Sequence, residues 1–166
     1  MTVEMALFAV AAIIALASAI MVITVKSPVA SVLYLILCIL AQSVLYIQLA
    51  GIFVAAFLVL VYGGAILVLF LFVIMMLNIR YADLGPDMLA AIKPWGWIFG
   101  LVLLAEMVWV SMGISSRMEA VEESFGSVPR VAELLYTRFV YPFELTSVLL
   151  LAAIVGAVIM ARKGLQ

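Results

Sequence analysis

The sequence has no histidine and only one cysteine, Cys38, among its 166 residues. A single cysteine excludes a disulfide framework within the chain, and without histidine a zinc site built from histidine and cysteine ligands is excluded as well. Cys38 lies inside the apolar stretch Leu33–Leu40. We therefore interpret Cys38 as a small buried hydrophobic residue.

Charged residues are also scarce. They make up 10% of the chain, whereas ordinary soluble domains contain about 25%. The net charge of -1 gives no basic excess that would indicate a nucleic-acid partner. Hydrophobic residues make up 70% of the chain, and a small soluble domain cannot bury so many, because most of its side chains lie near the surface. The composition therefore indicates a protein of the lipid bilayer.

Five apolar runs are each long enough to cross a bilayer, which requires about 20 residues of α-helix. We expect an all-α fold with five transmembrane helices in a single membrane domain, residues 1–166. The N-terminus lacks the basic region of a secretory signal, so the first helix is expected to be retained. A short amphipathic helix is expected over Val131–Val140. The expected spans are 5–25, 29–49, 51–77, 95–114 and 143–161.

The distribution of lysine and arginine predicts the orientation. Five crossings put the two termini on opposite sides of the membrane, and the cations are more numerous on the side of the C-terminus. Cytoplasmic loops carry the excess of such cations, so we expect a cytoplasmic C-terminus and an outside N-terminus. The C-terminal side holds Lys26, Arg80, Lys93, Arg162 and Lys163, and the other side holds Arg117, Arg130 and Arg138.

The third apolar run contains two adjacent glycines, Gly63 and Gly64, between Tyr62 and Ala65. Adjacent glycines weaken a helix locally and also let a neighbouring backbone approach closely. One hypothesis is a weak point that takes up a π-bulge, a widened turn often found at functional sites. The alternative is a close-packing face, with Tyr62 hydrogen-bonded to a neighbouring helix. The residues alone favour the alternative and leave the first hypothesis open.

Two acidic residues stand out. Glu106 is the one ionisable residue deep inside an expected span, where a charge is costly unless it faces protein or water. It is either part of a proton relay or a structural acid bonded to a partner helix. Glu144 follows Pro142 at the start of the last span, where an acid stabilises a helix N-terminus. A contact between Glu144 and another subunit is the other possibility.

Three stretches carry a resemblance to a known family: Val61–Asn78, Lys26–Val29 and Phe139–Glu144. The first resembles the third helix of subunit J of bacterial NADH–quinone oxidoreductase (respiratory complex I), whose mitochondrial counterpart is subunit six of NADH dehydrogenase. The second is similar to that family's Asn-Pro-Val turn, and the third looks like the start of its last helix. The resemblance covers most of the chain and is weakest over Asp83–Val140.

The resemblance implies a subunit of the bacterial inner membrane that has no cofactor of its own. FMN, iron–sulfur clusters and quinone would belong to other subunits of the complex. Its partners would be the quinone-site subunit, the antiporter-like pumping subunits and a small three-helix-type subunit. The family's third helix forms and relaxes a π-bulge, and its rotation opens a hydrated link for protons. Carried over, the bulge region is Tyr62, Gly63, Gly64 and Ala65, and Phe70 and Met75 lie on the rotating half.

The sequence also departs from the family. Many relatives carry an acid or a glutamine in the first half of the third helix, whereas Ile52–Leu60 has neither. A proton-shuttling acid is therefore absent from this helix, or its role is taken up elsewhere. Two alternative functions stay open beside a subunit of the oxidoreductase. One is a subunit of a cation/proton antiporter with Glu106 as its coupling acid, and the other is a purely structural membrane spacer.

Overall fold

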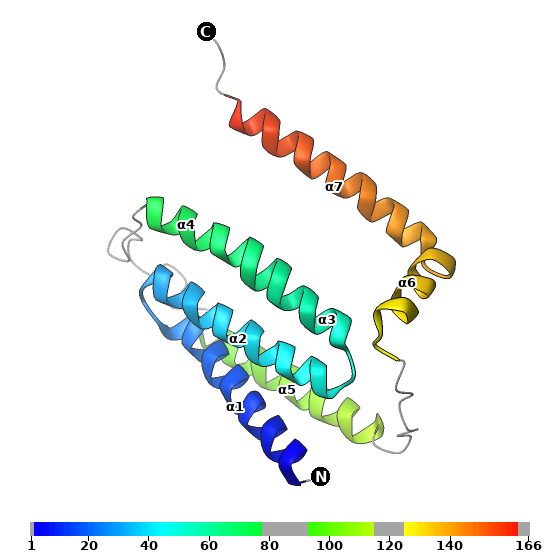
Figure 1. Cartoon of the computed structure of the whole chain (residues 1–166). Coiled ribbons are helices and arrows are strands. Elements are labelled where there is room, and N and C mark those ends of the chain that lie inside the picture. The colour runs from blue at the N-terminus through cyan, green and yellow to red at the C-terminus, as the bar shows by residue number, and fades with distance from the viewer. Residues whose placement is uncertain (1, 78–92, 115–124, 163–166) are drawn as a thin grey trace.

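The computed structural model describes residues 2–77, 93–114 and 125–162, and all regular secondary structure in these ranges is helical. Among the expected sites of charge, Arg80, Arg117 and Lys163 lie outside the described residues. Figure 1 shows the arrangement of the helices. In chain order they are α1 (Thr2–Thr24), α2 (Pro28–Gln48), α3 (Ile52–Phe57), η1 (Leu58–Ile66), α4 (Leu67–Leu77), α5 (Lys93–Ile114), α6 (Val128–Thr137) and α7 (Val140–Ala161).

Five stretches of this helical chain are long and apolar enough to cross a membrane, which confirms the predicted fold class. None of the five carries more than one charged residue over the length that a bilayer requires. The last span begins at Val140, earlier than the expected start at Phe143. The five spans are Val3–Thr24, Pro28–Gln48, Ile52–Leu77, Trp95–Gly113 and Val140–Ala161.

The first two spans form an antiparallel pair joined by a short turn. Ser27 caps α2 by accepting a hydrogen bond at its side-chain oxygen from the amide of Ala30, and Pro28 occupies the first turn, where its missing N–H costs nothing. Buried small side chains lie between the two helices, among them Ala11, Ser18 and Cys38. Small residues allow transmembrane helices to approach closely, so this pair forms the best-packed part of the described chain.

The third span packs along α2 and is divided into three pieces. It begins as α3, continues as the π-helix η1 and ends as the α-helix α4. Each of the three pieces contacts α2. Ala55 and Leu67, on either side of η1, are among the most buried residues of the chain. The span is therefore held against α2 at both ends of the π-helix.

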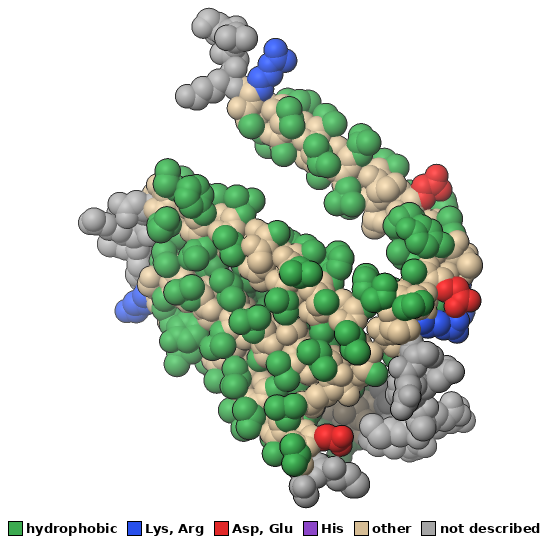
Figure 2. Space-filling view, viewed as in Figure 1, with side chains coloured by type: hydrophobic (Ala, Val, Ile, Leu, Met, Phe, Trp, Pro, Cys, Tyr) green, Lys and Arg blue, Asp and Glu red, His purple; other side chains and the backbone are tan. Residues whose placement is uncertain are grey.

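The fourth and fifth spans are covered much less by this chain. No described residue of α5 or α7 is buried. The main contact of α7 is with α6, to which it is joined at a corner where the rings of Tyr136 and Phe143 meet edge to face, with centroids 5.1 Å apart. Hydrophobic side chains dominate the visible surface (Figure 2), so lipid or other proteins must cover these spans.

Candidate functional site

The most unusual local feature of the structure is the π-helix in the middle of the third span. It covers nine residues, Leu58–Ile66, and its wider pattern persists at its end, where the amide of Leu67 donates to the carbonyl of Tyr62. π-Helical turns are rare and concentrate at functional sites. Tyr62, Gly63, Gly64 and Ala65, the residues that the sequence singles out, all lie inside it. Their role in coupling stays a prediction.

The surroundings of the two glycines bear on the two readings of this segment. A Cβ at Gly63 would lie 3.7 Å from the carbonyl oxygen of Leu58, its nearest contact. A Cβ at Gly64 would lie 3.4 Å from the carbonyl oxygen of Val59. Both contacts are within the same span. No atom of another described helix lies within 4 Å of either position. A close contact with another described helix therefore does not require glycine at either position, and the weak-point hypothesis stays a prediction.

The side chain of Tyr62 lies on the outer surface of this chain. It is 48% exposed, and its hydroxyl makes no hydrogen bond with any residue that the structure describes. A hydroxyl at membrane depth needs a partner, because leaving it unsatisfied in hydrocarbon costs several kcal/mol, roughly 2–7. Water or another protein must therefore supply that partner, which contradicts the reading in which Tyr62 bonds to a neighbouring helix of the described chain.

The half of the span beyond the π-helix faces α2 on one side. Phe70 and Ile74 line a hollow of about 180 Å³ together with Ser31 and Leu35 of α2. The Ser31 hydroxyl is itself occupied, since it donates a hydrogen bond to the carbonyl of Val22 on α1. Met75 is 58% exposed and is not among the residues of the hollow. The two residues predicted for the rotating half thus have different surroundings: Phe70 beside α2, Met75 at the surface.

A second hollow lies on the other side of the π-helix. It has a volume of about 310 Å³ and lies between the C-terminal part of α2 and the start of the third span. Loosely filled space on both sides of η1 leaves room for side chains to rearrange when the helix changes its pitch. Sequence reasoning did not find these hollows, because they depend on how the helices pack. The second is lined by Ser43, Ile47, Ile52, Ala55, Ala56, Val59 and Leu60.

The structure does not bring Glu106 to the π-helix. Glu106 is exposed on α5, where it lines a shallow groove with Ala105 and Trp109. No extensive contact joins α5 to any other helix of the described chain. Glu106 has no ion pair with a described residue. Because a lone acid at this depth is costly, the group that satisfies it belongs to another molecule.

Glu144 lies beyond the first turn of its helix. Because α7 begins at Val140, the first turn contains no acidic residue, and the favourable effect of a carboxylate falls off beyond that turn. The carbonyl of Glu144 accepts a hydrogen bond from the Ser147 hydroxyl at 2.7 Å, while its side chain is exposed. The helix-start interpretation is thereby weakened, and a contact with another subunit stays a prediction.

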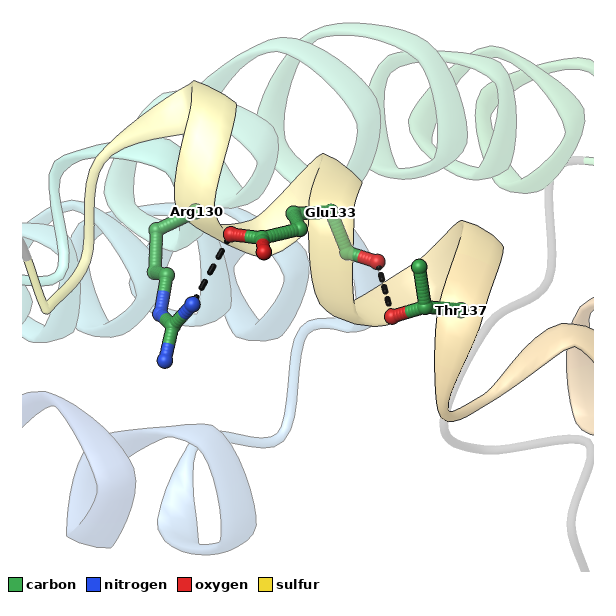
Figure 3. A network of polar contacts seen from close by, with 3 residues as sticks. All are labelled: Arg130, Glu133 and Thr137. Atoms are coloured by element: carbon green, nitrogen blue, oxygen red, sulfur yellow. Dashed lines mark hydrogen bonds and ion pairs between the residues drawn. The ribbon is translucent and has the colours of Figure 1, made fainter.

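The amphipathic helix expected over Val131–Val140 is present as α6, shifted toward the N-terminus. Its polar side carries an ion pair between Arg130 and Glu133 at 2.8 Å, and the Thr137 hydroxyl donates to the carbonyl of Glu133 at 2.6 Å (Figure 3). Both partners of the ion pair are about half exposed, so it contributes about 0–1 kcal/mol. Leu134 and Leu135 on the same helix are partly buried. An amphipathic helix of this kind is typical of a membrane surface.

Known proteins are similar to nearly the whole chain. Residues 18–160 match the family described as NADH-ubiquinone/plastoquinone oxidoreductase chain 6. The chain is 36% identical to NADH-quinone oxidoreductase subunit J of Rhodobacter capsulatus, over 98% of this chain and 84% of that protein. It is 36% identical to NADH-ubiquinone oxidoreductase chain 6 of Marchantia polymorpha, over 94% and 85%. It is 32% identical to F(420)H(2) dehydrogenase subunit J of Methanosarcina mazei, over 96% and 91%.

Proposed function

Because this chain belongs to the NADH-ubiquinone/plastoquinone oxidoreductase chain 6 family, we propose that it couples quinone reduction to proton translocation through its third transmembrane helix. It is a membrane subunit of a proton-pumping NADH–quinone oxidoreductase. The observation that carries the coupling role is the π-helix Leu58–Ile66, which lies at mid-span in a helix weakened by two glycines.

The geometry supports a rotary change in this helix. In an α-helix each residue advances by about 100° and 1.5 Å. Relaxing a π-turn by one residue therefore turns everything beyond it by about that angle relative to what precedes it. The part beyond is α4, with Phe70 beside α2. Relaxation would move Phe70 away from Ser31 and Leu35 and change which groups face the membrane interior.

The chain's own contribution in this proposal is conformational and not catalytic. In the described ranges no group of three histidine, cysteine, aspartate or glutamate residues is placed to hold a metal. FMN, iron–sulfur clusters and quinone would be bound by other subunits of the complex. Tyr62 and the freed backbone of η1 would hold water when the π-helix is open, and Glu106 on α5 would serve as a proton relay with a neighbouring subunit.

The exposed fourth and fifth spans fit a place inside a larger assembly. We propose that the quinone-site subunit, the antiporter-like subunits and a small three-helix-type subunit cover them, with Glu144 as a contact to one of these subunits. The proposed location is the bacterial inner membrane, with the N-terminus outside and the C-terminus cytoplasmic. The excess of lysine and arginine on the C-terminal side supports this orientation: five on that side (Lys26, Arg80, Lys93, Arg162 and Lys163) against three on the other (Arg117, Arg130 and Arg138).

The Methanosarcina mazei relative is named for F(420)H(2), so a similar membrane subunit serves a protein with another donor. Family membership favours the oxidoreductase over a cation/proton antiporter. A purely structural spacer is separated from the coupling role by the glycine variants described in the Discussion.

Purification of the C-terminally tagged chain from native membranes in mild detergent tests the assignment. The proposal predicts a large assembly that contains quinone-site and antiporter-like subunits and oxidises NADH with quinone. An assembly without NADH oxidation would point to another donor. A chain that purifies alone, or with cation-exchange subunits alone, would overturn the proposal.

A further inference from the structure

The segment before α6 meets the start of the third span backbone to backbone. The amide of Phe53 donates a hydrogen bond to the carbonyl of Gly126 at 3.4 Å. Gly126 is buried, and α6 contacts α3. Phe53 lies in the first turn of α3, where amides have no partner within the helix. The Gly126 carbonyl therefore satisfies a group that a membrane helix would otherwise leave unpaired.

Only glycine fits at this contact. A Cβ at Gly126 would lie 1.9 Å from the carbonyl oxygen of Ala50 and 2.7 Å from the Cα of Gly51. Both obstacles are backbone atoms, which cannot turn aside as a flexible side chain can. The glycines within the described helices differ sharply from Gly126, which lies in the turn before α6: nothing lies within 4 Å of a Cβ at Gly156 on α7, for example. The approach at Gly126 is thus closer than that at any other described glycine.

The turn against which Gly126 packs has a defined shape. The amide of Ala50 donates to the carbonyl of Ile47, and that of Gly51 donates to the carbonyl of Tyr46. With Ala50 in the left-handed region at φ 60°, these two bonds form the Schellman arrangement that ends a helix. The start of the third span is therefore fixed on one side by the end of α2 and on the other by Gly126.

We propose that Gly126 is a positioning residue, which holds the first turn of the third span stationary so that changes in the π-helix turn α4. The inference rests on the proposed function and adds a fixed point to it. A change in pitch at η1 turns its two ends relative to each other, and it moves α4 fully only if α3 is held. The bonded stretch ends at Phe53, and η1 begins at Leu58, so the fixed point directly precedes the deformable segment.

Variants at both ends of the contact test this role in the intact complex, reconstituted in vesicles. Phe53→Pro removes the donating N–H at a first-turn position, where proline is tolerated. Its control is Phe53→Ala, which removes the aromatic ring but keeps the N–H. Gly126→Ala introduces the clash, and Gly156→Ala is its control at an open position. The readouts are the rate of quinone reduction and the number of protons moved per electron.

We expect Phe53→Pro and Gly126→Ala to lower the number of protons moved per electron by about two-fold or more. A change of about two-fold is the smallest that variants altering the coupling between two sites produce. Quinone reduction and subunit content should stay near wild type, and both controls should pump normally. Normal pumping in both test variants would overturn the proposal. If Gly126→Ala does not assemble, Phe53→Pro decides. Loss of assembly in both would make the contact a folding element and also overturn it.

Failure of the fixed point at Gly126 can be distinguished from failure of the proposed function. If alanine at Gly63 and Gly64 lowers coupling while Phe53→Pro and Gly126→Ala do not, the coupling helix stands and the fixed point fails. If none of these variants lowers coupling in assembled complexes, both the proposed function and the fixed point fail.

Discussion

The amide of Leu67 donates its hydrogen bond to the carbonyl of Tyr62, passing over Gly63 and Gly64 by one residue more than an α-helix allows. This hydrogen bond is typical of a widened, π-helical turn, here in the middle of the third span. The two glycines between these residues have no side chains, so they make no side-chain contacts that would stabilise the α-helical pitch. The relationship between Leu67 and Tyr62 is therefore the one that changes if the helix relaxes to regular geometry.

Alanine at Gly63 or Gly64 should favour the relaxed helix. A Cβ fits at both positions, so assembly should be normal. Alanine is favoured over glycine in an α-helix by about 1 kcal/mol, which is a factor of about five in population. We expect quinone reduction to continue while fewer protons are moved per electron, measured by a pH-sensitive dye in vesicles.

The control for these variants is Gly156→Ala, where a Cβ also meets nothing. Gly63→Val should impair coupling at least as strongly, because a β-branched side chain is stiff. An unchanged ratio of protons to electrons in assembled Gly63→Ala, Gly64→Ala and Gly63→Val complexes would support a structural spacer.

Tyr62→Phe removes a hydroxyl that no described residue satisfies. If that hydroxyl holds water in the open helix, its loss should weaken the binding of this water by about 0.5–1.5 kcal/mol, the net contribution of one hydrogen bond. We expect slower proton transfer with normal assembly, measured as the initial rate of vesicle acidification. Tyr141→Phe, at a position that is 72% exposed on α7, is the control. Equal rates in both variants would remove Tyr62 from the proton path.

Glu106→Gln separates a relay from a structural acid. Glutamine keeps the hydrogen-bonding shape but cannot release a proton, so a relay predicts assembled complexes with reduced pumping. Glu133→Gln is the control, because it alters only the half-exposed ion pair on α6. Normal pumping in Glu106→Gln, together with loss of assembly in Glu106→Leu, would show that the acid serves only to bind a partner.

Ala50→Gly should stabilise the turn between the second and third spans. Alanine at φ 60° costs roughly 1–2 kcal/mol that glycine does not. We expect the variant complex to retain this subunit at a higher temperature in detergent, followed by size-exclusion chromatography of heated samples. Ala56→Gly, inside α3, should shift the temperature in the opposite direction. A lower temperature for Ala50→Gly would contradict the assignment of strain to this turn.

Apolar runs identified the five spans, because a bilayer demands length and hydrophobicity that are local properties of the chain. The glycine pair drew attention to this part of the third span, but the residues alone favoured a close-packing face over a weak point. The extent of η1 was less predictable: it starts at Leu58, well before Tyr62, since neighbouring carbonyls and the packing on α2 decide where the pitch changes. Gly126 had no recognisable signal, because its importance comes from a contact with Ala50 and Gly51, which are distant in the sequence.

In the proposed coupling, α4 turns against α2 while the first two spans stay fixed to each other. Cysteines at Leu35 and Phe70, which line one hollow, can be bridged by a short reducible bifunctional thiol reagent, with Cys38 replaced by serine. The control pair is Ala15→Cys with the native Cys38, whose sulfur lies 3.5 Å from the carbonyl of Ala15. We expect that bridging Leu35→Cys to Phe70→Cys stops proton translocation until a reductant is added, while the control bridge leaves translocation unchanged. Full pumping with the Leu35→Cys and Phe70→Cys bridge completely formed would contradict the proposed coupling.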